Sequence, residues 1–208
     1  MNVGHNELVA PDDRVAVATG TEFAERLLEV IDSGRRTATY KLALLLAILD
    51  LCSLRSDAGG FAPTAFTTRD LAEQVASLYW VQVAPFRLEA SSEALDLRQI
   101  TNKSSLVIDA VRLFRAAAEP TGATSLRMAH QRFPSEYSGV IDRIERTLAE
   151  QPLPRLQTVG TSETVFPFIY DLGPDWGANQ HFSVQRLRSH GPRGPVIPML
   201  PALPINDI

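Results

Sequence analysis

The sequence has a single cysteine among 208 residues, which excludes an internal disulfide. Its longest apolar run, Leu42 to Leu49, is far shorter than the roughly 18 residues that a membrane-spanning helix needs. The N-terminus also lacks the basic-then-apolar layout of a secretory signal peptide. We therefore expect a cytoplasmic protein without a membrane segment. Cys52 lies among leucines, and we expect its thiol to pack as a small hydrophobic group.

Catalytic and metal-binding signatures are missing as well. The four histidines have neither the spacing nor the cysteine partners of a zinc site. No glycine-rich phosphate loop precedes a predicted helix, and no G-x-S-x-G nucleophile elbow is present. The sequence therefore predicts no cofactor, no metal and no catalytic residue.

Lysine is scarce, and the overall charge is negative. Lys41 and Lys103 are the only lysines among 20 basic residues, and the net charge is −4. A negative net charge opposes indiscriminate coating of nucleic acid. Basic residues nevertheless gather in residues 35–41, 98–115 and 186–193. Local basic patches on an acidic chain favour specific contacts with anions, although a solvated charged surface remains the alternative for any single patch.

Apolar residues recur at helical spacing along most of the chain, which predicts a mainly α fold: a compact helical domain with a small β-hairpin near the C-terminus. The segment from Leu42 to Leu54 is apolar on nearly every side, which predicts a central helix buried all round. Residues 56–66 are predicted as a loop. Thr67 and Asp70 then have the spacing of a capping box, which predicts a helix running to Pro85. The other predicted apolar faces are Phe23, Leu27, Val30 and Ile31; Leu71, Val75, Leu78 and Tyr79; Leu106, Ile108, Val111, Leu113 and Phe114; and Val140, Ile141, Ile144 and Leu148.

The chain changes character towards its end. Residues 165–172 and 181–189 have the composition of two short strands that form the hairpin. The last 18 residues contain five prolines, which favours an extended or disordered tail. The sequence therefore predicts a flexible arm over 1–19, a helical domain over 20–172, and a Pro/Gly-rich tail with a possible strand over 173–208.

Two predicted helix starts carry basic residues, which is the wrong charge for a helix N-terminus. A bound phosphate would reverse this balance, because free backbone N–H groups, hydroxyls and guanidinium groups would then converge on one anion. Several such contacts on one face would suit a nucleic-acid backbone. Arg69 follows two threonines at a third helix start. The predicted contacts are Arg35, Arg36, Thr37, Thr39, Lys41, Arg98, Gln99, Asn102, Lys103 and Ser104.

Tyr79 and Trp80 are adjacent, so we expect that they do not both face the core of a helical domain. One of them, or Gln82, is then available to a ligand. The alternative is that Trp80 is a core aromatic residue with its indole N–H hydrogen-bonded.

These segments resemble a known family in their order and spacing. GRRTATYKLALLLAILDL (34–51), LYWVQVAPF (78–86) and LRQITNKSS (97–105), followed by RLFR and PFIYD, resemble the N-terminal DNA-recognition region of bacterial HNH endonucleases. The resemblance covers about residues 20–172 and extends to the sulfur-binding domain of type IV, modification-dependent restriction endonucleases. It implies binding of double-stranded, phosphorothioate-modified DNA. The chain has no His-Asn-His pattern, so cleavage would depend on an HNH nuclease module in a longer chain or in relatives.

A site for a phosphorothioate sulfur should offer a shallow apolar cavity beside cationic contacts to the neighbouring phosphates. The resemblance implies that arginine and lysine position the DNA backbone, while Gln99 and Asn102 contact base edges. The residues that it implies for the sulfur cavity are Tyr40, Tyr79, Trp80, Val81 and Gln82.

Two other hypotheses stay open. The chain is a helical protein-interaction module without DNA binding, in which case the basic patches are solvated surface. Alternatively, it is an enzyme whose site the sequence does not reveal.

Overall fold

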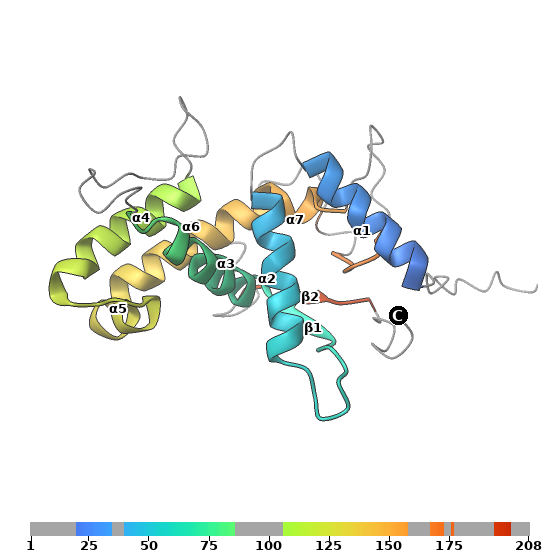
Figure 1. Ribbon diagram of the computed structural model, residues 1–208, viewed down its shortest axis with the longest axis horizontal. Helices are drawn as coiled ribbons and strands as arrows, with labels where there is room; N and C mark the ends of the chain where they lie inside the picture. Colours follow the sequence, from blue (N-terminus) through green and yellow to red (C-terminus); the bar gives the residue numbers. More distant parts are fainter. Residues whose placement is uncertain are drawn as a thin grey trace, which may run out of the picture.

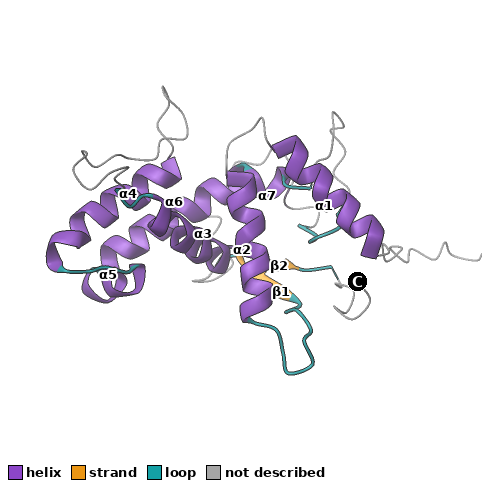
Figure 2. Cartoon of the chain, in the orientation of Figure 1, coloured by secondary structure: helices purple, strands orange, loops and turns teal. Residues whose placement is uncertain are grey.

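The computed structural model describes residues 20–34, 40–85, 106–157, 167–172, 176 and 194–200. This part of the chain is mainly helical with one small antiparallel sheet, as predicted (Figure 2). The predicted arm and the predicted strand at 181–189 lie outside the described residues. The elements in chain order are α1 (Gly20–Gly34), α2 (Tyr40–Leu54), β1 (Ala65–Thr67), α3 (Thr68–Gln82), α4 (Leu106–Ala118), a 3₁₀ turn (Glu119–Thr121), α5 (Leu126–Arg132), α6 (Pro134–Glu150), α7 (Pro152–Arg155) and β2 (Val196–Pro198).

Helix α3 is the centre of the fold. It packs against α2 on one side and against α4 and α6 on the other (Figure 1). Because α3 is covered on two sides, Tyr79 and Trp80 are both buried, with 1% and 4% of their surface exposed. The prediction that these two neighbours do not both face the core is therefore wrong. The predicted apolar face holds at Leu71 and Val75, which are buried.

Helix α2 is buried over only part of its circumference. Leu44 and Ile48 lie in the core, but Leu46 and Leu49 are about half exposed. The prediction of a helix buried all round is wrong, because α1, α3 and α7 contact α2 and leave one side uncovered. Cys52 is half-buried and packs against the core, as expected for a small hydrophobic thiol.

Helix α4 shows which of its apolar residues form the core face. Leu106 and Leu113, which we predicted on that face, are 60% and 67% exposed. The predicted set combined residues from two sides of the helix. Three residues of the predicted face are buried: Ile108, Val111 and Phe114. Helix α4 also buries Val107, Ala110 and Ala118, which follow the same spacings of three and four.

Helix α6 ends before Pro152, as predicted, and buries Ile141, Ile144 and Leu148. Pro152 then begins the short helix α7, which we did not predict, and proline suits the first helical turn because no intrahelical partner is lost there. Helix α5 is a further seven-residue helix that the apolar pattern did not reveal. None of the described helices is long and apolar enough to cross a membrane.

The small sheet joins distant parts of the chain. β1 and β2 are antiparallel, with Phe66 opposite Ile197 at the centre of the register. The predicted β element near the C-terminus is confirmed, but its partner is β1, which lies ahead of α3, and not a neighbouring strand of a local hairpin. Of the predicted strand at 165–172, the described part contributes one bridge, from Tyr170 to Met199. Residues 194–200 are extended, as predicted, and Ile197 is buried in the core.

Candidate functional site

The start of α2 gathers positive charge. Lys41 lies in the first turn of this helix, and Arg155 of α7 acts on it electrostatically. Burial lowers the pKa of Lys41, and the charge of Arg155 lowers it further. The described part of the chain places no carboxylate within ion-pair distance of either residue. The other predicted contacts of this helix start, Arg35, Arg36, Thr37 and Thr39, lie outside the described residues.

The second predicted basic helix start falls just ahead of α4, which begins at Leu106. Its predicted contacts are all outside the described residues: Arg98, Gln99, Asn102, Lys103 and Ser104.

The predicted sulfur cavity is not formed by residues 79–82. Tyr79 and Trp80 lie in the core, whereas Val81 (73% exposed) and Gln82 face solvent. Four consecutive residues of one helix point in different directions, so α3 divides this set between core and surface. Tyr40 is half-buried and packs against the core at the start of α2.

Trp80 has the partners of a structural residue. Its indole Nε1 lies 3.5 Å from the carbonyl oxygen of Thr124. The guanidinium of Arg115 lies 5.1 Å from the centroid of the Trp80 ring and donates to the Trp80 carbonyl at 2.6 Å. This carbonyl belongs to the last turn of α3, where a cation offsets the negative end of the helix dipole. The alternative that Trp80 is a core aromatic residue is therefore the one that the contacts support.

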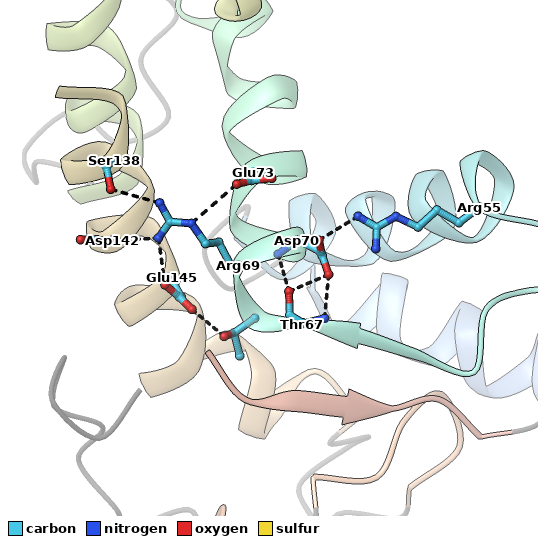
Figure 3. Close-up of polar contacts among 9 residues, drawn as sticks. Arg55, Thr67, Arg69, Asp70, Glu73, Ser138, Asp142 and Glu145 are labelled. Atoms are coloured by element: carbon cyan, nitrogen blue, oxygen red, sulfur yellow. Dashed lines mark hydrogen bonds and ion pairs between the residues drawn. The ribbon is translucent and has the colours of Figure 1, made fainter. Parts of the chain in front are cut away.

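The third basic helix start is neutralised within the chain. Arg69, in the first turn of α3, lies 2.7 Å from Asp142, 3.6 Å from Glu73 and 3.7 Å from Glu145 (Figure 3). It also donates to the hydroxyl of Ser138 at 3.2 Å. With three carboxylates around it, this guanidinium is not available to a phosphate.

The capping box at the start of α3 is confirmed. The side chain of Thr67 accepts from the backbone N–H of Asp70 at 3.1 Å, and the carboxylate of Asp70 accepts from the backbone N–H of Thr67 at 2.9 Å. Arg55, the residue directly after α2, donates to the same carboxylate at 2.8 Å (Figure 3). Burial would raise the pKa of Asp70, but the bonds from Arg55 and Thr67 outweigh it and lower this pKa to about 2.

Glu145 is a fully buried acid that the sequence pattern did not reveal. Its carboxylate accepts a 2.6 Å hydrogen bond from the hydroxyl of Thr68, which is also fully buried. Gly194 lies against both groups and adopts a left-handed backbone conformation, with φ of 74°. The next residue, Pro195, accepts a backbone hydrogen bond from Thr68 at 3.0 Å. This cluster anchors the C-terminal segment to α3 and α6.

A cavity of about 350 Å³ opens between α2, α3, α5 and α6. The ring of Tyr137, on its wall, stacks on His130 at 3.9 Å. Burial and the nearby charge of Glu73 raise the pKa of Tyr137 to about 12, against the opposing influence of Arg69. Ion pairs from Arg55 and Arg69 neutralise the two carboxylates of the wall. Within the described ranges, no group of three or more histidine, cysteine or acidic side chains is arranged to hold a metal ion.

Comparison of the chain with protein-family models, with curated proteins and with solved structures finds no match.

Proposed function

We propose that this chain is a DNA-recognition domain that binds the phosphate backbone of duplex DNA beside the N-terminus of α2. The observation that carries the proposal is that two cations lie at this end of the fold: Lys41 in the first turn of α2, and Arg155 on α7, which packs against α2. The pKa of Lys41 is lowered by burial and by the charge of Arg155. The sequence resemblance to the recognition region of type IV restriction endonucleases supports phosphorothioate DNA as the modified ligand. It also supports an HNH nuclease module as the catalytic partner.

The charge balance at the described ends of α2 and α3 favours this location. Arg55 and Arg69 both meet carboxylates within the chain. Lys41 and Arg155 meet no described carboxylate, and among the described residues the Arg155 guanidinium donates to the side-chain oxygen of Gln151, at 2.9 Å. Two cations beside the positive end of a helix dipole are destabilising in isolation. A bound phosphate would offset the charges of Lys41 and Arg155 together with the positive end of the helix dipole. Two further cations, Arg35 and Arg36, precede the same helix in the sequence.

The sulfur-specific part of the proposal does not rest on the Tyr79–Trp80 pair, because both side chains are core residues. A sulfur atom keeps the charge of the phosphate and is larger and a weaker hydrogen-bond acceptor. Apolar contacts beside the cationic contacts would therefore discriminate it. Tyr40, half-buried next to Lys41, is the described aromatic residue in the right place for such a contact.

Binding of matched duplexes with and without a single phosphorothioate tests the proposal. We expect tighter binding of the modified duplex, and we expect Lys41→Ala and Arg155→Ala each to weaken binding and to reduce the slope of log affinity against log salt by about 1. Arg36→Ala and Lys103→Ala, at the two predicted helix starts, should behave in the same way. Arg146→Ala, which removes an exposed cation on α6, is the matched control and should leave binding unchanged.

The outcomes separate the hypotheses. Equal affinity for both duplexes would exclude sulfur recognition and leave general DNA binding. Unchanged binding by Lys41→Ala and Arg155→Ala would exclude the phosphate site at α2. Absence of binding to any duplex would favour the protein-interaction module.

A further inference from the structure

The face formed by α4 and α6 carries a shallow apolar groove of about 430 Å³, at the end of the molecule away from α1 (Figure 1). Leu113 and Ala117 of α4 and Gly139 and Val140 of α6 line it. Leu113 is 67% exposed, and Leu106, two turns earlier on α4, is 60% exposed. Large aliphatic side chains at this exposure, beside a groove, are a surface that a partner would cover. We call this surface the α4–α6 groove.

The fold of the single chain does not explain why a glycine, Gly139, stands in the wall of the groove. It lies inside α6, where glycine is less favourable than alanine by about 1 kcal/mol. A Cβ atom built at this position would meet nothing within 4 Å, so no contact among the described residues requires a glycine. Its backbone is helical and not in the left-handed region. The residue therefore leaves an open place on α6 where another element can approach the helix backbone closely.

Two opposite charges flank that place. Glu136 and Arg143 both line the α4–α6 groove, and both side chains are exposed. Neither makes an ion pair with any residue that the structure describes. They lie seven residues apart, which is two helical turns or about 10 Å along α6. The midpoint between them falls between Gly139 and Val140, at the centre of the open place.

From this arrangement we propose that the α4–α6 groove binds a second copy of this chain, with the two α6 helices antiparallel about a two-fold axis between Gly139 and Val140. A two-fold axis makes every contact reciprocal, so Glu136 meets the partner's Arg143 and Arg143 meets the partner's Glu136. Gly139 permits the close helix approach, and Leu113 of each copy is covered. The proposal is independent of DNA binding.

Charge complementarity favours a second copy of this chain over a polyanion or a different protein as the partner of the groove. A surface with one acid and one base placed symmetrically about its centre is complementary to itself when it is turned by 180°. A polyanion would gain from Arg143 and be repelled by Glu136. Another protein would have to present the same charges in the opposite order, and an identical chain does so without further assumption.

Sedimentation equilibrium of the protein without DNA, from micromolar to millimolar concentration, tests the proposal. We expect a reversible dimer. Glu136→Arg and Arg143→Glu should each raise its dissociation constant by at least about tenfold, because each reversal places like charges together at two symmetric positions. The double variant, Glu136→Arg with Arg143→Glu, should return the dissociation constant to within about threefold of the original, because the reciprocal pairs are re-formed.

Gly139→Leu provides a test that does not involve charge. It fills open space on the monomer, so the melting temperature should stay the same or rise, while the dimer should be lost. Glu25→Arg and Arg26→Glu, on the exposed side of α1, are matched controls and should leave the dissociation constant unchanged. A chain that sediments as a monomer throughout, a dimer that survives Gly139→Leu, or a double variant as weak as the single ones would overturn the proposal.

Discussion

At the scale of single residues, Gly194 sets how closely the C-terminal segment approaches the core. Its backbone is in the left-handed region, and a Cβ atom would collide with the hydroxyl of Thr68 and the carboxylate of Glu145. Neither group has room to yield, because both are fully buried and hydrogen-bonded to each other. A side chain at this position would therefore separate a buried acid from its partner.

Gly194→Ala is expected to lower the free energy of unfolding by about 2 to 4 kcal/mol, through backbone strain combined with the steric clash. Gly60→Ala is the matched control, because Gly60 has a similar φ of 80° but nothing within 4 Å of a Cβ. It should lose only about 1 kcal/mol, from the left-handed conformation alone. Urea denaturation of both variants measures the difference, and equal losses would contradict a steric role for the Thr68–Glu145 pair.

At the scale of elements, the start of α3 is held by one carboxylate that serves two purposes. Asp70 completes the capping box with Thr67, and it also binds Arg55 at the end of α2. The residue is 4% exposed, so its charge depends on these hydrogen bonds. Because they lower the pKa of Asp70 to about 2 from the usual 3.8, the charged form is bound more strongly in the folded chain than in the unfolded one.

The sign of the pH dependence follows from this lowered pKa. The stabilisation from ionised Asp70 is complete above the unfolded pKa of 3.8 and is lost as the pH falls towards the folded pKa of about 2. The difference in unfolding free energy between the wild type and Asp70→Asn should therefore shrink by roughly 2 kcal/mol between about pH 5 and about pH 2. Denaturant titrations across this range measure it. Glu150→Gln, at the exposed end of α6, is the control, and a constant difference for Asp70→Asn would refute the linkage.

The same helix shows how far sequence reasoning extends. The capping box could be predicted because Thr67 and Asp70 lie within one turn and the signal is local. The partners of Arg69 could not, because Asp142 and Glu145 are more than 70 residues away and only the packing of α3 on α6 brings them together. Arg69 was therefore grouped with basic helix starts, although it is neutralised in the fold.

Core faces were predictable only where one side of a helix is covered. Ile141, Ile144 and Leu148 of α6 follow a single stripe and were predicted correctly. For Trp80 the sequence left a ligand-facing and a core position open, because α3 is covered on two sides and a periodic pattern does not show how many neighbours a helix has. β1 was missed because three residues carry no alternating pattern and their partner strand lies near the other end of the sequence.

At the scale of the whole molecule, the sheet closes the described fold by joining residues 65–67 to residues 196–198. Ile197 is 1% exposed and lies opposite Phe66, which is 2% exposed. Pro195 accepts the backbone N–H of Thr68 at the start of α3. The C-terminal segment is therefore part of the core of the helical domain, although its composition of proline and glycine suggested a tail.

A chain shortened to residues 1–193 should consequently lose much of its stability. Removal of β2 takes Ile197 out of the core, exposes Phe66, and leaves Thr68 without its backbone acceptor. We expect the free energy of unfolding to fall by at least about 4 kcal/mol, which corresponds to a fall in melting temperature of about 10 °C for a chain of this size. A chain shortened to residues 1–200 keeps every described contact of β2 and should melt close to the full-length protein. Thermal unfolding followed by circular dichroism compares the three chains, and a 1–193 chain that melts with the 1–200 chain would show that the sheet does not close the fold.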